Sequence, residues 1–118
     1  MTKEQQKKLD KLYQGILLSK YNNRSILGGE ATLIHHFLPK SSGLSLRWYL
    51  PNGVPLNIEQ HNIIHSSDPQ AKVYIDYIIN LKGKSWVENL KKQRSKICKY
   101  LRYDEVMRHI SMIDDNYC

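Results

Sequence analysis

Four of the five histidines of this chain fall within a short stretch, with a spacing suited to a metal site. His35 and His36 are adjacent at the end of an apolar run with strand character. Neighbouring side chains on a strand point to opposite faces, so one imidazole can bind a metal while the other points toward a substrate, provided that the strand twists or frays there. His61 and His65 are four apart in a segment predicted to be helical, which puts both rings on one helical face. Because such pairs commonly bind transition metals, three of the four histidines are predicted to bind one metal ion.

The elements that would position these histidines follow from the residues between the two pairs. Proline, serine, asparagine and glycine mark loops, and Leu44, Leu46, Trp48 and Leu50 alternate with polar residues between them. Loop residues flanking an alternating run predict a second strand that returns toward the first. The expected local order is strand, loop, strand, turn, helix.

The four histidines can also be explained as ordinary structural residues that bind no metal. A single histidine is most often a surface or core residue, and one i, i+4 pair is weak evidence, but four histidines in this window favour a metal site. For Asn52 a role at the site and a role in the turn stay open, because Pro-Asn-Gly is ordinary turn chemistry.

The motif resembles the HNH or His-Me finger nucleases, whose ββα-metal fold has this order of elements. The pattern is most similar to the DNase colicins, with the pair His35 and His36, the turn residue Asn52, and the helical pair His61 and His65. A second resemblance, to the phage NinG/Rap recombination endonucleases that cut branched DNA, extends over a longer part of the chain. It covers Leu46-Arg47-Trp48, Tyr77-Ile78, Gly83, Val87-Glu88, Leu90 and the basic region that follows. Asn57 and Gln60 replace the cysteine pair that often precedes the helical ligand, so no structural zinc is expected.

The resemblance implies a role for each residue of the motif. His35, His61 and His65 would be the metal ligands, with positions left open for a scissile phosphate and water. His36 would be the general base that takes a proton from the attacking water. Asn52 would orient His36 or brace the loop between the strands. The family chemistry gives 5′-phosphate and 3′-hydroxyl ends.

The remaining residues predict helices on both sides of the motif. Thr2 and Gln5 form a capping-box pattern ahead of a helix over about 3–21 whose apolar stripe should pack on the motif. Asn57 and Gln60 do the same for the motif helix, and further helices are expected from Pro69 to Lys82, from a Ser85/Glu88 capping box to about Lys96, and from about Tyr103 to Ile113. The fold class is therefore α+β, a ββα-metal core with a small antiparallel hairpin, packed by an N-terminal helix and C-terminal helices. Residues 1–118 are expected to form one nuclease domain: 1–27 as the N-terminal helical part, 30–67 as the ββα-metal motif and 68–118 as a basic helical region.

Composition and charge favour a polyanionic partner. The net charge is +7 over 118 residues, and such a balance most often indicates nucleic acid, although an acidic protein or membrane surface would also fit the charge alone. No apolar run approaches a membrane span, and the polar start lacks the apolar region of a signal peptide, so a cytoplasmic protein is expected, in the host cytoplasm if phage-encoded. Cys98 and Cys118 lack CxxC partners, which favours reduced thiols.

Cations in the C-terminal half are the main candidates for DNA contacts. Solvated helix faces are the alternative explanation for this cluster. From Lys82 to Arg102 there is one acid, Glu88, and the expected phosphate contacts are Lys84, Lys91, Lys92, Arg94, Lys96 and Lys99, with Lys40 and Arg47 nearer the motif.

The sequence thus predicts a metal-dependent HNH endonuclease that hydrolyses DNA phosphodiester bonds, with branched recombination intermediates as candidate substrates. The alternatives are a nucleic-acid-binding protein that keeps the HNH scaffold without turnover, and a nonspecific toxin-type DNase. One divalent ion is expected, and three imidazoles suit Zn, Ni, Co or Mn better than Mg. No membrane partner is expected, and a homodimer would suit symmetric cutting of two strands.

Overall fold

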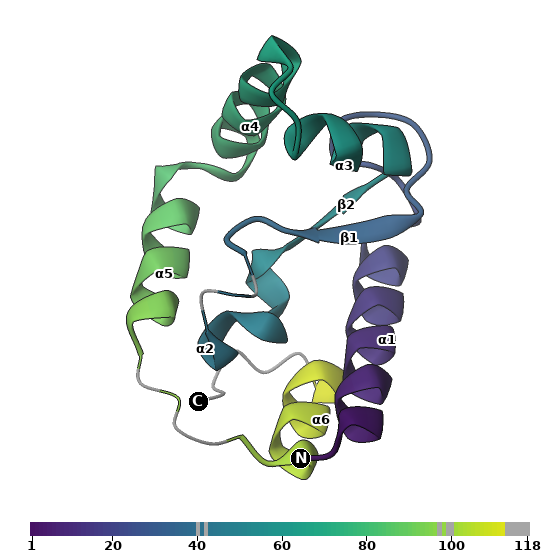
Figure 1. Ribbon diagram of the computed structural model, residues 1–118, viewed down its shortest axis with the longest axis vertical. Coiled ribbons are helices and arrows are strands. Elements are labelled where there is room, and N and C mark those ends of the chain that lie inside the picture. The colour runs from purple at the N-terminus through teal and green to yellow at the C-terminus, as the bar shows by residue number, and fades with distance from the viewer. Residues whose placement is uncertain (40, 42, 97, 99–100, 113–118) are drawn as a thin grey trace.

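The computed structural model describes residues 1–39, 41, 43–96, 98 and 101–112. Over these residues the chain is α+β and mostly helical, with a small antiparallel sheet, as expected for the fold class. The elements in chain order are α1 (Lys3–Lys20), β1 (Leu33–His36), α2 (Leu44–Arg47), the 3₁₀ turn η2 (Leu50–Asn52), β2 (Gly53–Leu56), α3 (Ile58–Ile64), α4 (Pro69–Lys82), α5 (Lys84–Ser95) and α6 (Tyr103–Met112). Figure 1 shows the hairpin of β1 and β2 at the centre, with α3 on one side of it and α2 on the other.

Helix α1 provides much of the apolar core. Its first turn is closed by the predicted capping box of Thr2 and Gln5, in which each side chain accepts a hydrogen bond from the other residue's backbone N–H. The helical period then places Leu9, Tyr13 and Leu17 on one buried face, which packs against α6 and the hairpin. The buried cluster consists of these residues together with Ile34, Trp48, Leu50, Leu101, Val106 and Ile110.

The hairpin pairs β1 with β2 in an antiparallel register that sets His35 opposite Val54 and His36 opposite Gly53. Glycine is required at position 53 because a Cβ there would collide with the side chains of Leu17, Ile34 and Tyr13. The close approach of α1 to the hairpin therefore depends on the missing side chain.

The second strand lies later in the chain than predicted. The alternating residues Leu46, Trp48 and Leu50 are buried, but Leu46 lies in α2, Leu50 in η2 and Trp48 in the turn between them, not in a strand. Backbone amides here bond to carbonyls three residues earlier, as from Tyr49 to Leu46, so the alternation reflects burial in a run of tight turns. The strand that returns to β1 is Gly53–Leu56, which places Asn52 immediately before the second strand and not after it.

The helices after the hairpin follow the predicted signals with one exception. Asn57 and Gln60 form the expected capping box of α3, and Asp68 caps α4, which ends at Gly83. The predicted Ser85/Glu88 box is wrong, because α5 begins at Lys84 directly after Gly83 and Ser85 already lies inside the helix. The expected end of the last helix, residue 113, lies outside the described residues.

The structure also bears on two expectations about the thiols and about membrane-spanning segments. Cys98 is disulfide-bonded, so the expectation of a reduced thiol is wrong for this residue. Among the described residues, no helix combines the length and the apolar character that crossing a membrane requires.

Candidate metal centre

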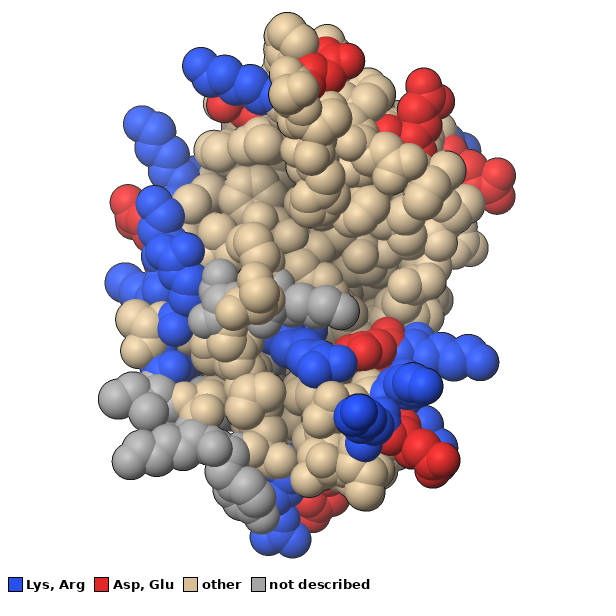
Figure 2. All heavy atoms as spheres, viewed as in Figure 1, with Lys and Arg blue, Asp and Glu red and all other residues tan. Residues whose placement is uncertain are grey.

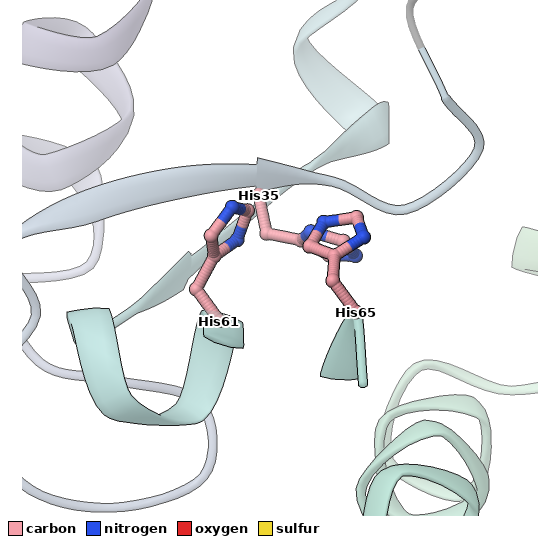
Figure 3. A group of neighbouring side chains, drawn as sticks. All are labelled: His35, His61 and His65. Atoms are coloured by element: carbon pink, nitrogen blue, oxygen red, sulfur yellow. The ribbon is translucent and has the colours of Figure 1, made fainter. Parts of the chain in front are cut away.

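Three histidines from two elements meet beside the hairpin. His35 comes from β1, His61 from α3, and His65 is the residue that caps the C-terminal end of α3. Each offers a ring nitrogen, and these three atoms lie within 4.8 Å of one another. Figure 3 shows the rings of His61 and His65 rising from α3 toward the ring of His35. The three imidazoles are therefore close enough to hold one metal ion.

The surroundings keep the imidazole at the centre of this group neutral. His35 is only 5% exposed, and burial followed by its neighbours His61, His65 and His36 lowers its pKa from 6.5 to about 4. Burial and the neighbouring histidines also lower the pKa of His61. Because a metal binds neutral imidazole, these residues are ready to act as ligands near pH 7 without first losing a proton.

His61 carries a polar atom whose purpose the fold does not explain. Within the part of the chain that the structure describes, Nδ1 of His61 is buried and has no hydrogen-bond partner. Leaving a buried polar atom unsatisfied costs about 1–3 kcal/mol. A metal ion among the three rings would give a buried imidazole nitrogen a partner, and three imidazoles are a donor set typical of zinc and related ions, so the residues fit such an ion.

His36 borders the same cavity but makes different contacts. Its ring stacks on Tyr13 with centroids 5.3 Å apart, and its Nε2 lies 2.9 Å from the backbone carbonyl oxygen of Arg47. A carbonyl oxygen only accepts hydrogen bonds, so a neutral His36 carries its proton on Nε2 and its lone pair on Nδ1. The strand alternation thus separates His36 from the three-histidine cluster, as the sequence predicted.

The side chain of Arg47 is bound to two residues of α1. The guanidinium donates to both carboxylate oxygens of Asp10, with Nη2 to Oδ2 at 3.0 Å, and Nη1 donates to Gln6. The indole Nε1 of Trp48 also donates to Asp10, at 2.8 Å. Arg47 therefore joins α2 to α1 and fixes the carbonyl that meets His36, whereas the sequence had placed it among the DNA contacts.

Asn52 braces the segment after β1. It is fully buried, its Nδ2 donates to the Leu38 carbonyl at 2.8 Å, and its Oδ1 accepts from the Leu38 N–H at 2.9 Å. Its own carbonyl accepts from the Phe37 N–H. Of the two roles left open for Asn52, these contacts support bracing of the loop.

The predicted DNA-binding cations lie mainly on one helix. Lys84, Lys91, Lys92 and Arg94 are exposed on α5, and Lys96 is exposed just after it. Figure 2 shows Lys and Arg side chains gathered along this edge of the molecule. Lys40 and Lys99 lie outside the described residues.

Three residues of α1 border the site although their sequence pattern did not indicate it. Asp10, Tyr13 and Gln14 line a cavity of about 620 Å³ together with the histidines. Tyr13 was expected only as part of the apolar stripe, and Asp10 carries no motif. The sequence did offer one indication: these residues belong to or adjoin the apolar stripe of α1 that packs on the hairpin, and a helix that covers a site contributes residues to it.

Comparisons of the chain with models of protein families, with curated proteins and with solved structures gave no match.

Proposed function

We propose that this protein is a metal-dependent DNA endonuclease of the HNH type, with β1, β2 and α3 as its ββα-metal core. One observation carries the proposal: the adjacent residues His35 and His36 serve two different arrangements at one cavity. His35 joins His61 and His65, while His36 is held separately by Tyr13 and the Arg47 carbonyl. Metal-dependent hydrolysis of a phosphodiester uses a metal ion as Lewis acid and a separately oriented imidazole as general base, and this arrangement could supply both.

His35, His61 and His65 would hold the ion, and they leave positions open because three ligands do not fill the coordination sphere of a transition metal. The bound ion would supply Lewis-acid stabilisation of the charge that develops on the phosphate. Zn, Ni, Co and Mn suit three imidazoles better than Mg does.

His36 would take the proton from the attacking water through Nδ1. The Arg47 carbonyl selects this tautomer by accepting the hydrogen bond from Nε2, and the ring of Tyr13 limits rotation of the imidazole. Fixing the orientation of a base is worthwhile because proton transfer requires hydrogen-bonding distance and alignment. Asn52 would act on the loop that follows, through Leu38.

The exposed cations of α5 would contact DNA phosphates. Such contacts provide affinity without sequence specificity, and the only acid on this helix is Glu88.

The test is cleavage of linear duplex, single-stranded, flap and four-way-junction DNA by protein freed of metal and then supplied with each divalent ion in turn. Wild-type protein should cleave only when an ion is present. His36→Ala should lower the rate by about 10²- to 10⁴-fold while DNA binding is retained. Its matched control is Glu59→Gln, an exposed change on α3 that should cleave like the wild type.

The same experiment separates the alternatives. DNA binding without cleavage under any ion would replace the nuclease with a binding protein on the same scaffold. Equal cleavage of all substrates would indicate a nonspecific DNase. Undiminished cleavage by His36→Ala would refute the role of His36 as the base.

A further inference from the structure

We propose that the cavity beside the three histidines binds one unpaired nucleotide, whose base lies against the aliphatic side chains of Ile64 and Ile75. This inference deepens the nuclease function proposed above and rests on it. It narrows the substrate to DNA that presents an unstacked base at the cleavage site, such as a single strand, a flap or the branch point of a junction.

The first support is the size and construction of the cavity. Its volume of about 620 Å³ lies within the range of roughly 300–1,000 Å³ found for pockets that enclose a small ligand. It is bounded by α1, β1, α3 and α4, so its walls come from elements and not from one loop. A nucleotide has the size of such a ligand, whereas a duplex is too wide to enter.

The second support is the chemistry of the walls. Besides the histidines, the cavity is lined by Ile64 of α3 and by Ile75 and Ile78 of α4. Ile78 is fully buried beneath the surface, while Ile64 and Ile75 are half-exposed and available for contact. Aliphatic side chains offer nothing to the charged backbone of a duplex, but apolar side chains do pack against the flat face of an unpaired base.

The third support is the distribution of charge. Apart from the histidines, Asp10 is the charged residue among the described cavity-lining residues, and its carboxylate is already paired with Arg47. The cations lie outside this lining: Figure 2 shows them along α5, and a further group, Lys3, Lys7, Lys8 and Lys11, is exposed on α1. The described surface thus separates an edge suited to phosphates from a neutral pocket suited to a base, with the histidines at the pocket.

Polar groups at the cavity match the edge of a base. Gln14 offers an amide donor and acceptor, and Ser41 a hydroxyl, both exposed at the rim. Hydrogen bonds to an unpaired base commonly accompany apolar contact with its face.

The experiment measures binding without turnover. A short single-stranded oligonucleotide carrying 2-aminopurine is titrated with metal-free full-length protein, and the fluorescence is compared with that of the same oligonucleotide in a duplex. The single strand should give a saturable change, and the duplex should bind at least about tenfold more weakly, since its bases must first be unpaired and unstacked to enter the cavity.

Two substitutions on α4 provide a matched pair. Ile75→Ser removes part of the aliphatic wall and should weaken binding of the single strand about tenfold, whereas Val73→Ser, on the outer surface of the same helix, should leave it unchanged. Ile75→Phe, which fills the cavity without removing apolar surface, should also weaken binding. A wild-type circular dichroism spectrum from each Ile75 variant would show that the loss of binding does not come from unfolding.

The inference is overturned if Ile75→Ser and Ile75→Phe, both folded, bind the single strand as the wild type does, or if duplex and single strand bind equally well. The titration involves neither metal nor cleavage. If the protein binds the unpaired base but never cleaves DNA, the nuclease function is rejected and the binding pocket is retained. Cleavage of intact duplex that is insensitive to Ile75 would reject the pocket alone.

Discussion

The two sides of the hairpin are held by different forces. On the side of α1 and α6, fully buried side chains such as Leu9, Tyr13 and Ile110 form a continuous apolar core. On the other side, α3 has no fully buried residue, and Ile58 at its start is 60% exposed. Besides its packing against α4, α3 is fixed by polar contacts: its capping box, and hydrogen bonds that join Gln60 to Ser25 and to the Gly28 carbonyl.

This difference indicates how the protein divides stability from function. Burial of apolar surface dominates folding free energy, so the side with α1 and α6 should set the global stability. A helix with few buried contacts opens at lower cost, so the half of the site built on α3 should depend on a bound ligand for its rigidity. His35, on the strand between the two sides, then belongs to the stable half, and His61 and His65 to the weaker one.

The largest effect should come from truncating the core. Leu9→Ala should lower the free energy of unfolding by about 2–5 kcal/mol, because it opens a cavity at a fully buried position. Ile58→Ala on α3 should change it by less than about 0.5 kcal/mol, because that side chain is mostly exposed. Urea denaturation measures both, and equal losses would show that the two sides do not differ.

The next effect is a dependence of stability on pH. The pKa of His35 falls from 6.5 to about 4 on folding, so the unfolded chain binds the proton more tightly. The stability that neutral His35 contributes is fully present above about pH 6.5 and is lost as the pH falls through 4, a loss of about 3 kcal/mol for metal-free protein. Denaturation at a series of pH values should show this slope, and His35→Asn should flatten it. A slope unchanged in the variant would remove His35 as its source.

Metal should stabilise the weaker side selectively. At about a hundred times its dissociation constant, an ion that binds only the folded chain adds about 2.7 kcal/mol. Hydrogen exchange should slow more in α3 than in α6, which already packs in the core. His61→Ala should abolish both effects. Uniform slowing across the chain, or none in α3, would contradict the division between the two sides.

The contact between α1 and α2 at Asp10, within the more stable side, can be tested next. Asp10→Asn removes the charged acceptor of Arg47 and should cost about 1.5 kcal/mol in the free energy of unfolding. Because Arg47 then no longer fixes its carbonyl, nitrogen NMR should show His36 losing its preference for the Nε2–H tautomer. A variant that is destabilised but keeps this tautomer would limit Asp10 to a structural role.

The smallest effect concerns the cations of α5. Lys91→Ala should weaken DNA binding uniformly across sequences and reduce the slope of log affinity against log salt by about 1. Lys72→Ala, an exposed lysine on α4, is the control and should leave the slope unchanged. Equal slopes in both variants would show that the charge of α5 is only a solvated face.

Local signals were readable from the sequence where they act over a few residues. The capping residues Thr2, Asn57 and Asp68 and the terminator Gly83 act within one turn of helix, so the predicted bounds of α1, α3 and α4 agree closely with the structure. The i, i+4 spacing of His61 and His65 likewise brought both rings to one face.

Features decided by distant contacts were not readable. The alternation of Leu46, Trp48 and Leu50 arises from burial in the folded chain, where Trp48 and Leu50 join the core with α1 and α6, and it is indistinguishable in sequence from the period of a strand. The true second strand contains Pro55 and begins at Gly53, residues typical of turns, and Gly53 is needed only because α1 crosses there. The roles of Arg47 and Asp10 also depend on a contact between segments far apart in the chain.

The central claim is that His35, His61 and His65 share one divalent ion while His36 stays outside the ligand set. Calorimetric titration of metal-free protein with Zn²⁺ or Mn²⁺ tests it directly. The wild type and His36→Ala should each bind one ion with similar affinity, and His61→Ala should bind it at least about tenfold more weakly. Loss of binding in His36→Ala, or unchanged binding in His61→Ala, would contradict the claim.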